Sequence, residues 1–380
     1  MPTRSKSDFN YSVSDSQILT KEVFTFMFEL NEKVQNLIPY DPVAGKYRIR
    51  LDANESFVTP SQALREQIDE ELRHIHFNRY PDPYAEEVRK AFADLYGVPR
   101  SCVMAGNGSD EVITVVMNAF LQKGDTVVTL SPDFSMYGFY AALVECRVVT
   151  VEKNADCTVD AEKIIDTVNR TGARMLVFSN PCNPTSLVLA REEVRKIVSS
   201  VEALVVLDEA YMDFSDQSML SEFAGFDNLL ILKTCSKALG MAAVRLGFAV
   251  GTQRLIDVLQ AAKSPYNVNT LTQAVGTVVL SHPEYLQAAV QRILESRDEL
   301  YTGFVLLQEA YPQAKLHVFK PDANFVYIQT PKAAEIFEYL KENGIIVRLT
   351  GGALRVSAGR NYENEAVLHE VEACLKGESA

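Results

Sequence analysis

The stretch at 204–211, Leu-Val-Val-Leu-Asp-Glu-Ala-Tyr, places a carboxylate directly after a short apolar run. The run is rich in branched aliphatic residues without polar alternation, which is typical of a β-strand covered on both faces. Six similar runs lie between residues 100 and 251, and helical patterns such as Glu111–Leu121 separate them. This alternation predicts an α/β fold, with a mainly parallel seven-stranded sheet between helices. The seven predicted strands are Cys102–Ala105, Thr126–Leu130, Arg147–Val151, Met175–Ser179, Leu204–Leu207, Leu229–Leu232 and Gly247–Val250.

The pattern changes after residue 282. A long helical stretch, Pro283–Ala310, is followed by the apolar run Asn324–Ile328, a helix at Ala333–Asn343, two short runs and a last helix at Glu363–Leu375. Such an order is typical of a compact α+β unit.

We therefore expect three parts. Residues 1–30 form an N-terminal arm, residues 31–60 together with 283–380 form a small α+β domain, and residues 61–282 form the large ligand-binding domain. No repeat or flexible linker separates the two domains, so we expect them to pack together with a cleft between them.

Composition excludes several classes of protein. Asp and Glu number 50 against 37 Lys and Arg, giving a net charge of -13, which argues against a broad nucleic-acid-binding surface. No run approaches the ~18 apolar residues of a membrane span, and the N-terminus lacks the pattern of a signal peptide. The six cysteines are scattered, without the spacing of a metal site. We expect a cytoplasmic protein with no metal, membrane or nucleic-acid partner.

Polar residues follow several of the predicted strands, and ligands of parallel α/β sheets bind at the carboxyl ends of strands. Gly106-Asn107-Gly108 opens a helix after the first strand, Asn183 lies in a proline-rich turn, and Asp208 follows the run at 204–207. Lys237 comes shortly after the run Leu229–Leu232, beside two hydroxyl side chains. A lysine in that setting is a candidate nucleophile rather than a solvated surface residue.

One chemistry would use all of these groups. A lysine amine forms a Schiff base with an aldehyde, and an aspartate beside a pyridine nitrogen keeps that nitrogen protonated, so that the ring withdraws electrons. Helix-start N–H groups, hydroxyls and an arginine hold a phosphate. A cofactor carrying an aldehyde, a ring nitrogen and a phosphate is therefore predicted.

With these residues in order, the sequence resembles the fold-type-I pyridoxal-phosphate aminotransferases, and within them the histidinol-phosphate aminotransferase branch. The resemblance covers residues 34–376. Its motifs are Tyr-Pro-Asp at 80–82, Gly-Asn-Gly-Ser-Asp-Glu at 106–111, Pro-x-Phe-x-x-Tyr at 132–137, Asn-Pro-x-Asn-Pro-Thr at 180–185, Asp-Glu-Ala-Tyr at 208–211, Ser-Lys-Ala at 236–238 and Arg-Leu-Gly at 245–247.

The resemblance implies a role for each matching residue. Lys237 forms the Schiff base with pyridoxal 5'-phosphate and shuttles a proton, Asp208 pairs with the ring nitrogen, and Tyr211 contacts the ring oxygen. Tyr80 reaches the phosphate of a second subunit, which implies a homodimer. The remaining implied cofactor contacts are Ser109, Asp110, Phe134, Asn183, Thr234, Ser236 and Arg245, and the implied substrate contacts are Tyr40, Asn54, Arg348 and Arg355.

Three residues or segments depart from the family pattern. Ser186 stands where the family usually has glycine, so the backbone there must avoid a strongly positive φ or tolerate strain. Phe134 replaces the commoner tyrosine, which keeps ring stacking but loses a hydroxyl. Only six residues separate Arg348 from Arg355, where the histidinol-phosphate branch usually carries a longer loop, so one wall of the substrate pocket is remodelled.

The resemblance implies transfer of an amino group from an anionic amino donor to a 2-oxo acid, with histidinol phosphate and 2-oxoglutarate, in histidine biosynthesis, as the leading pair. An aromatic amino-acid aminotransferase and a decarboxylase of a phosphorylated amino acid remain alternatives. A dinucleotide-binding dehydrogenase is disfavoured, because Glu111 occupies the position of the third glycine or alanine of its fingerprint. A non-catalytic protein of the same fold would have no need of both Lys237 and Asp208.

Overall fold

The computed structural model describes residues 28–35 and 43–377 of the chain. Contacts divide the chain into two compact units, residues 1–39 and residues 40–380. In the first unit the described residues include one short helix, α1 (Glu32–Gln35). Everything below concerns the second unit.

The seven predicted strands are confirmed, and they form one sheet in the order β2-β8-β7-β6-β5-β3-β4. Only β8 runs against its neighbours, pairing antiparallel with both β2 and β7. The strands are β2 (Val103–Gly106), β3 (Thr126–Ser131), β4 (Arg147–Glu152), β5 (Met175–Ser179), β6 (Leu204–Asp208), β7 (Leu229–Thr234) and β8 (Gly247–Gly251).

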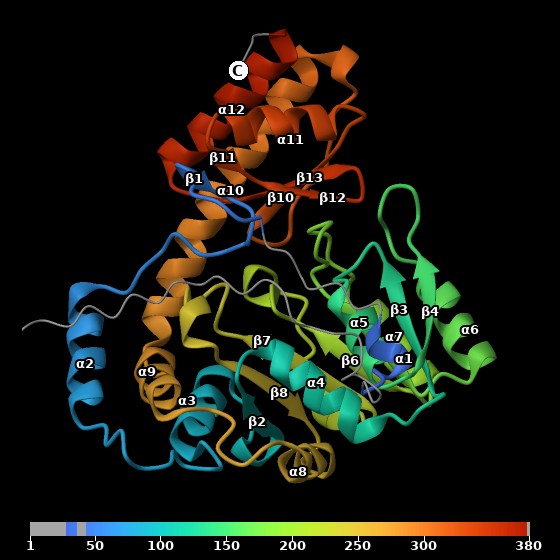
Figure 1. Ribbon diagram of the computed structural model, residues 1–380, viewed down its shortest axis with the longest axis vertical. Helices are drawn as coiled ribbons and strands as arrows, with labels where there is room; N and C mark the ends of the chain where they lie inside the picture. The colour runs from blue at the N-terminus through green and yellow to red at the C-terminus, as the bar shows by residue number, and fades with distance from the viewer. Residues whose placement is uncertain (1–27, 36–42, 378–380) are drawn as a thin grey trace, which may run out of the picture. The chain divides into compact units, whose positions relative to one another are not determined.

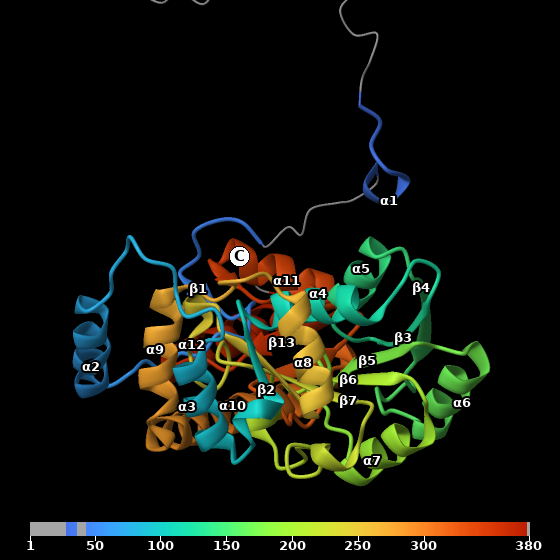
Figure 2. The same ribbon diagram turned by 90° about the horizontal axis from the view of Figure 1, so that it is seen from below.

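Helices cover both faces of this sheet, as its uninterrupted apolar strands require. Successive residues of β5 show this, because Met175 and Val177 join one buried cluster while Leu176 and Phe178 join another. The first cluster includes α4 (Ser109–Phe120), α5 (Met136–Leu143) and α8 (Gln253–Ala262). The second includes α3 (Glu86–Tyr96), α6 (Ala161–Thr171), α7 (Arg191–Ser200) and α9 (Thr270–Leu280). Helix α2 (Gln62–Arg73) packs beside α9 (Figure 2).

A second, smaller sheet is antiparallel, in the order β12-β13-β10-β9 (Figure 1). Its strands are β9 (His317–Val318), β10 (Phe325–Gln329), β12 (Arg348–Thr350) and β13 (Ala353–Ser357). The N-terminal strand β1 (Ile49–Arg50) joins this region by pairing in parallel with β11 (Ile345–Ile346). Helices α10 (Pro283–Ala310), α11 (Ala333–Glu342) and α12 (Asn361–Lys376) complete its apolar core.

The two sheets are joined through helix α10, whose 28 residues span roughly 42 Å at 1.5 Å per residue. Its Ala289 and Ile293 pack in a small cluster with Tyr211, Ala238 and Phe325. That cluster brings together Tyr211 and Ala238, which follow strands of the large sheet, and Phe325, which lies on β10 of the small sheet. It includes Tyr211, one of the side chains that the sequence predicts to bind the cofactor. The expected boundaries of an arm, a large domain and a small domain stay a prediction.

Candidate functional site

A cavity of about 360 Å³ opens at the carboxyl ends of β5, β6 and β7. It brings together almost every residue that the sequence marks as functional. Tyr80 is the exception among the described residues, since it does not line this cavity, and Tyr40 lies outside the described residues. The predicted residues that line the cavity are Asn54, Ser109, Asp110, Phe134, Asn183, Asp208, Tyr211, Thr234, Ser236, Lys237, Arg245, Arg348 and Arg355.

Lys237 lies on the turn three residues beyond β7. Its Nζ donates a hydrogen bond of 2.9 Å to the carbonyl oxygen of Ala53 and lies 5.7 Å from the centroid of the Tyr211 ring. The side chain is only partly buried, so the amine is accessible from the cavity. This position suits an amine that reacts with a carbonyl carbon.

Asp208 ends β6 at the floor of the cavity, 5% exposed. One carboxylate oxygen accepts a hydrogen bond of 2.7 Å from the Tyr137 hydroxyl, and the other accepts one of 3.0 Å from the backbone N–H of Ala210. Burial raises the pKa of Asp208 to about 6, although both hydrogen bonds oppose the rise. A carboxylate held in this way is a ready partner for a cationic ring nitrogen.

Tyr137 has no assigned role in the sequence interpretation, although it ends the Pro-x-Phe-x-x-Tyr motif. The signal was its spacing, because Phe134 and Tyr137 are three residues apart and therefore neighbours at the start of α5. Their rings meet edge to face, with centroids 5.4 Å apart. Both side chains line the cavity, and Tyr137 also supports Asp208.

Tyr211 and Asn54 meet at the other side of the cavity. The Asn54 amide donates to the Tyr211 hydroxyl at 2.9 Å, and its amide oxygen accepts from the Ser357 hydroxyl at 3.0 Å. Asn54 is 1% exposed and adopts a φ of +54°, which asparagine tolerates better than most residues. The amide therefore orients the phenol as well as lining the cavity.

The end of the cavity near α4 has the form of a phosphate cradle. Helix α4 starts at Ser109, so its first backbone N–H groups are available to an anion. Thr234 and Ser236 add hydroxyls 3.0 Å apart. Gly108 has a φ of +83°, and a Cβ there would lie 2.6 Å from the Arg245 guanidinium.

A second glycine makes the same cradle possible. At Gly247, on β8, a Cβ would lie 2.4 Å from the backbone nitrogen of Ser109. The Arg245 guanidinium itself lies 3.5 Å from the Asp110 carboxylate. The close backbone approach, the helix start, the hydroxyls and the arginine together fit the phosphate of the predicted cofactor.

A buried polar network lies behind Asn183 and Phe134. The Asp133 carboxylate accepts from the Phe134 backbone N–H at 2.7 Å and from both the N–H and the hydroxyl of Ser179. The Ser179 hydroxyl in turn accepts from the Asn183 N–H at 3.1 Å. Lys153 lies 4.0 Å from Asp133, and both side chains are 2% exposed. Burial raises the pKa of Asp133, and the charge of Lys153 opposes this.

The side of the cavity where the sequence predicts substrate contacts carries a pair of arginines on the β12–β13 hairpin. Arg348 and Arg355 are directly opposite one another in the antiparallel register, so their side chains share one face. The hairpin closes through Gly351 and Gly352, with φ values of +58° and +76°, as a two-residue turn requires. Arg50, which sequence interpretation did not single out, lines the same cavity.

Arg355 is the better anchored of the two arginines. It is 8% exposed, and it donates to the amide oxygen of Asn183 and to the carbonyl oxygen of Asp52. Its guanidinium also lies 5.4 Å from the centroid of the Phe325 ring. Arg355 is therefore fixed at the boundary between the predicted cofactor contacts and the substrate side.

Tyr80 is 81% exposed and stacks on Tyr266, with ring centroids 4.6 Å apart. Ser186 has a φ of +65°, so of the two options that the sequence left open the backbone adopts the strained one.

Within residues 28–35 and 43–377, no cluster of three or more His, Cys, Asp or Glu side chains is arranged to hold a metal. No helix of that part of the chain is long and apolar enough to cross a membrane.

Comparison with known proteins decides the family. Residues 47–371 match the family described as aminotransferase class I and II. The chain belongs to this family. It is 37% identical to a histidinol-phosphate aminotransferase of Clostridium novyi, over 91% of this chain and 96% of that protein. It is 36% identical to one from Thermococcus gammatolerans, over 92% and 98% of the two chains.

Solved structures show the same fold. The crystal structure of histidinol-phosphate aminotransferase from Sinorhizobium meliloti, in complex with pyridoxal-5'-phosphate, aligns with a TM-score of 0.83 at 22% identity, covering 93% of this chain and all of that one. Thermus thermophilus aspartate aminotransferase with maleate aligns with a TM-score of 0.77 at 21% identity, covering 92% and 100%. The prediction of a fold-type-I, pyridoxal-phosphate-dependent aminotransferase is confirmed.

Proposed function

We propose that this aminotransferase moves the amino group of histidinol phosphate to 2-oxoglutarate in histidine biosynthesis. The observation that carries the proposal is the facing pair Arg348 and Arg355, which offers two guanidinium groups to a substrate anion. Guanidinium groups suit both a phosphate and a carboxylate, and the reaction needs one site to accept each in turn. The names and the extent of similarity of the relatives from Clostridium novyi and Thermococcus gammatolerans support the same substrate.

The residues around the cavity provide the steps. The bound cofactor supplies an electron-withdrawing ring that makes the substrate α-carbon acidic. Lys237 would supply the amine that bonds to the cofactor aldehyde, and it would hold and move the proton at the substrate α-carbon. Asp208, oriented by Tyr137, holds the ring nitrogen in its protonated form. Asn183 and Tyr211 orient the ring oxygen.

The other predicted contacts hold the two ends of the ligands. Phe134 covers one face of the ring. The start of α4 at Ser109 and Asp110 binds the phosphate together with Thr234, Ser236 and Arg245. On the substrate side, Arg355 and Arg348 bind the anionic group, with Asn54 beside them. Tyr40 keeps its proposed substrate role and lies outside the described residues.

A panel of amino donors with 2-oxoglutarate tests the substrate. Histidinol phosphate, phosphothreonine, phenylalanine and aspartate are compared by glutamate formation, and carbon dioxide release is followed in parallel. We expect histidinol phosphate to give the highest kcat/KM, by roughly 100-fold or more, because it offers a phosphate to the facing arginines and is the substrate named for the relatives. A higher kcat/KM with phenylalanine would favour an aromatic aminotransferase. Carbon dioxide from phosphothreonine without glutamate would favour the decarboxylase.

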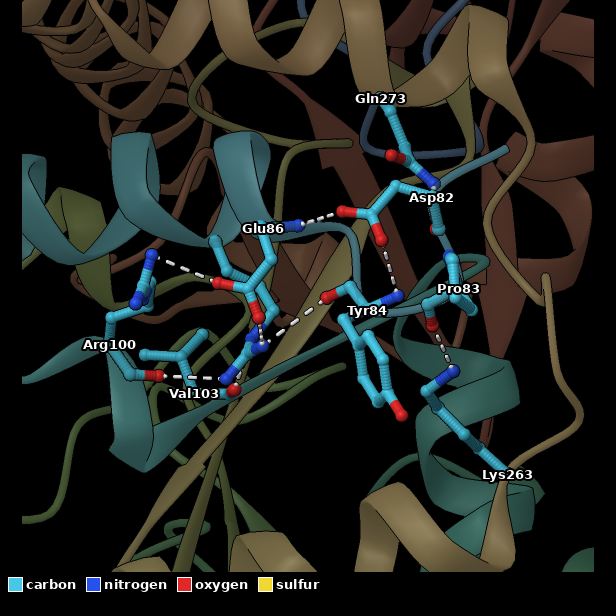
Figure 3. Close-up of polar contacts among 9 residues, drawn as sticks. Asp82, Pro83, Tyr84, Glu86, Arg100, Val103, Lys263 and Gln273 are labelled. Atoms are coloured by element: carbon cyan, nitrogen blue, oxygen red, sulfur yellow. Dashed lines mark hydrogen bonds and ion pairs between the residues drawn. The ribbon is translucent and has the colours of Figure 1, made fainter. Parts of the chain in front are cut away.

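We further propose a homodimer in which Tyr80 completes the phosphate site of the second subunit. In its own subunit Tyr80 does not line the cavity and is 81% exposed. The segment behind it is firmly held (Figure 3): Gln273 donates to the Asp82 carbonyl and Lys263 to the Pro83 carbonyl, each at 2.9 Å. A rigid segment that presents an exposed phenol is suited to donation across an interface.

Arg89 holds the same segment from inside the fold. It is 7% exposed and donates to the carbonyl oxygens of Tyr84, Arg100 and Val103, while pairing with Glu86. Burial lowers its pKa, and Glu86 opposes this.

The site of action is proposed to be the cytoplasm, in keeping with six cysteines that are all free thiols.

A further inference from the structure

Ser186 occupies a backbone conformation that favours glycine. Its φ is +65°, and the residue is completely buried in the loop that follows β5. A side chain in the left-handed region is a cost to stability, so a contact made by that side chain must offset it.

The contacts of Ser186 join this loop to the chain that leads into β10. Its hydroxyl accepts a hydrogen bond of 2.9 Å from the backbone N–H of Ala323, which is itself fully buried. Its carbonyl oxygen accepts one of 2.9 Å from the N–H of Asp322. The Asp322 carboxylate returns a third bond, accepting at 3.1 Å from the N–H of Val188.

A second link connects the same two parts of the molecule. Asn183, three residues before Ser186, accepts a hydrogen bond from Arg355 through its amide oxygen. Arg355 lies on β13, which pairs with β10, and its guanidinium lies over Phe325, two residues after Ala323. The contacts therefore form a closed ring from Asn183 through Ser186, Ala323 and the two strands back to Arg355.

We propose that Ser186 is a positioning residue that fixes the position of Arg355 relative to Asn183. By holding Arg355 in place, Ser186 sets the affinity for the anionic end of the substrate. The inference rests on the proposed role of Arg355 in binding that anion. Glycine at this position would relieve the backbone but lose the bond to Ala323. Serine keeps the bond at the expense of the backbone.

Two substitutions separate positioning from stability. Ser186→Ala and Ser186→Gly both remove the bond to Ala323, but only the glycine variant relieves the backbone strain. We expect both to raise the KM for 2-oxoglutarate and for the best amino donor by roughly 5- to 20-fold, with kcat within about two-fold of the parent. The melting temperature of the glycine variant should exceed that of the alanine variant.

Thr330→Ala serves as the matched control. Thr330 is also a buried hydroxyl residue of the small-sheet region, and it donates to the Ala314 carbonyl oxygen at 2.7 Å, but it does not line the cavity. This variant should lose stability and keep its KM values. The proposal is overturned if KM is unchanged in both Ser186 variants, or if KM follows melting temperature across all three.

Failure of the positioning role of Ser186 and failure of the substrate proposal give different results. If the parent enzyme does not use histidinol phosphate, the substrate proposal fails, and the KM comparison is made with 2-oxoglutarate and the donor that the enzyme uses best. If the parent uses histidinol phosphate but the Ser186 variants match it in KM, only the positioning role fails.

Discussion

The two ends of the cavity are built in different ways. At the proposed cofactor end, Asp208 ends β6 and Lys237 lies three residues beyond the neighbouring strand β7. At the substrate end, Arg348 and Arg355 come from a hairpin of a second sheet, whose placement depends on contacts between distant segments. The proposed cofactor contacts thus come from short continuous motifs, whereas the proposed substrate contacts depend on how two sheets meet. Substitution at the proposed cofactor end should therefore change kcat or cofactor affinity, and substitution at the proposed substrate end should change KM.

Among the substitutions that test this comparison, Lys237→Ala should have the largest effect. It removes the amine and the proton carrier together, so kcat should fall by roughly 10³-fold or more. The phosphate cradle is untouched, so the variant should still bind the cofactor, as titration of its absorbance would show. Borohydride should fix the cofactor on a peptide containing Lys237 in the parent enzyme alone. A parent protein that takes up no cofactor would refute the assignment.

Arg355→Lys tests the substrate end. Lysine keeps the charge, but its compact ammonium group lacks the planar fork of donors with which a guanidinium can bind Asn183, the Asp52 carbonyl and a substrate anion at once. We expect kcat/KM to fall by about 2–3 kcal/mol in transition-state binding, or roughly 30- to 150-fold, with the cofactor absorbance unchanged. Arg348→Lys is the paired variant and should lose less. The reverse order would move the anion site to Arg348.

Tyr137→Phe probes the support of Asp208 through pH. The hydrogen bond from Tyr137 lowers the pKa of Asp208 against the effect of burial, so its loss should raise that pKa further above about 6. Because the charged carboxylate pairs with the protonated ring nitrogen, cofactor affinity should weaken as pH falls through this pKa. In the variant the weakening should begin at higher pH, by up to roughly one unit for one hydrogen bond. Cofactor titration of the apoenzyme between pH 5 and about pH 8 measures the midpoint; identical midpoints would contradict the proposed support.

Tyr80→Phe should give the smallest effect. Removing one hydroxyl contact to the neighbouring phosphate should weaken cofactor binding by about 1 kcal/mol, or roughly five-fold. Tyr266→Phe is the control, because it keeps the ring that stacks on Tyr80. Sedimentation of the parent enzyme should show a dimer at working concentration. An active monomer with full cofactor affinity would exclude the shared site.

The sequence predicted the large sheet well because its strands are continuous apolar runs with both faces buried. It placed Asp208 and Lys237 correctly in one cavity because both follow such runs. Short strands were harder: β9 has two residues, and the pairing of β1 with β11 joins segments almost 300 residues apart. Neither leaves a periodic pattern to detect.

Contacts between the ends of different strands could not be predicted from the sequence. Tyr137 stood in a quoted motif, yet its bond to Asp208 joins residues 71 positions apart. The link from Asp133 through Ser179 to Asn183 combines the ends of two strands, and the charge of Lys153 comes from a third. The Ser186 departure was visible, but its partner Ala323 lies 137 positions away. Spacing predicts neighbours on one element and not those brought together by packing.

The two-residue turn at Gly351 and Gly352 has a consequence for engineering. It is among the shortest connections that can join β12 to β13, and both glycines are exposed. Residues inserted there would extend outward without shifting the register that places Arg348 opposite Arg355. The hairpin is thus a natural grafting point, where loops of different length can be installed to screen for altered donor preference while Lys237 and its surroundings remain untouched.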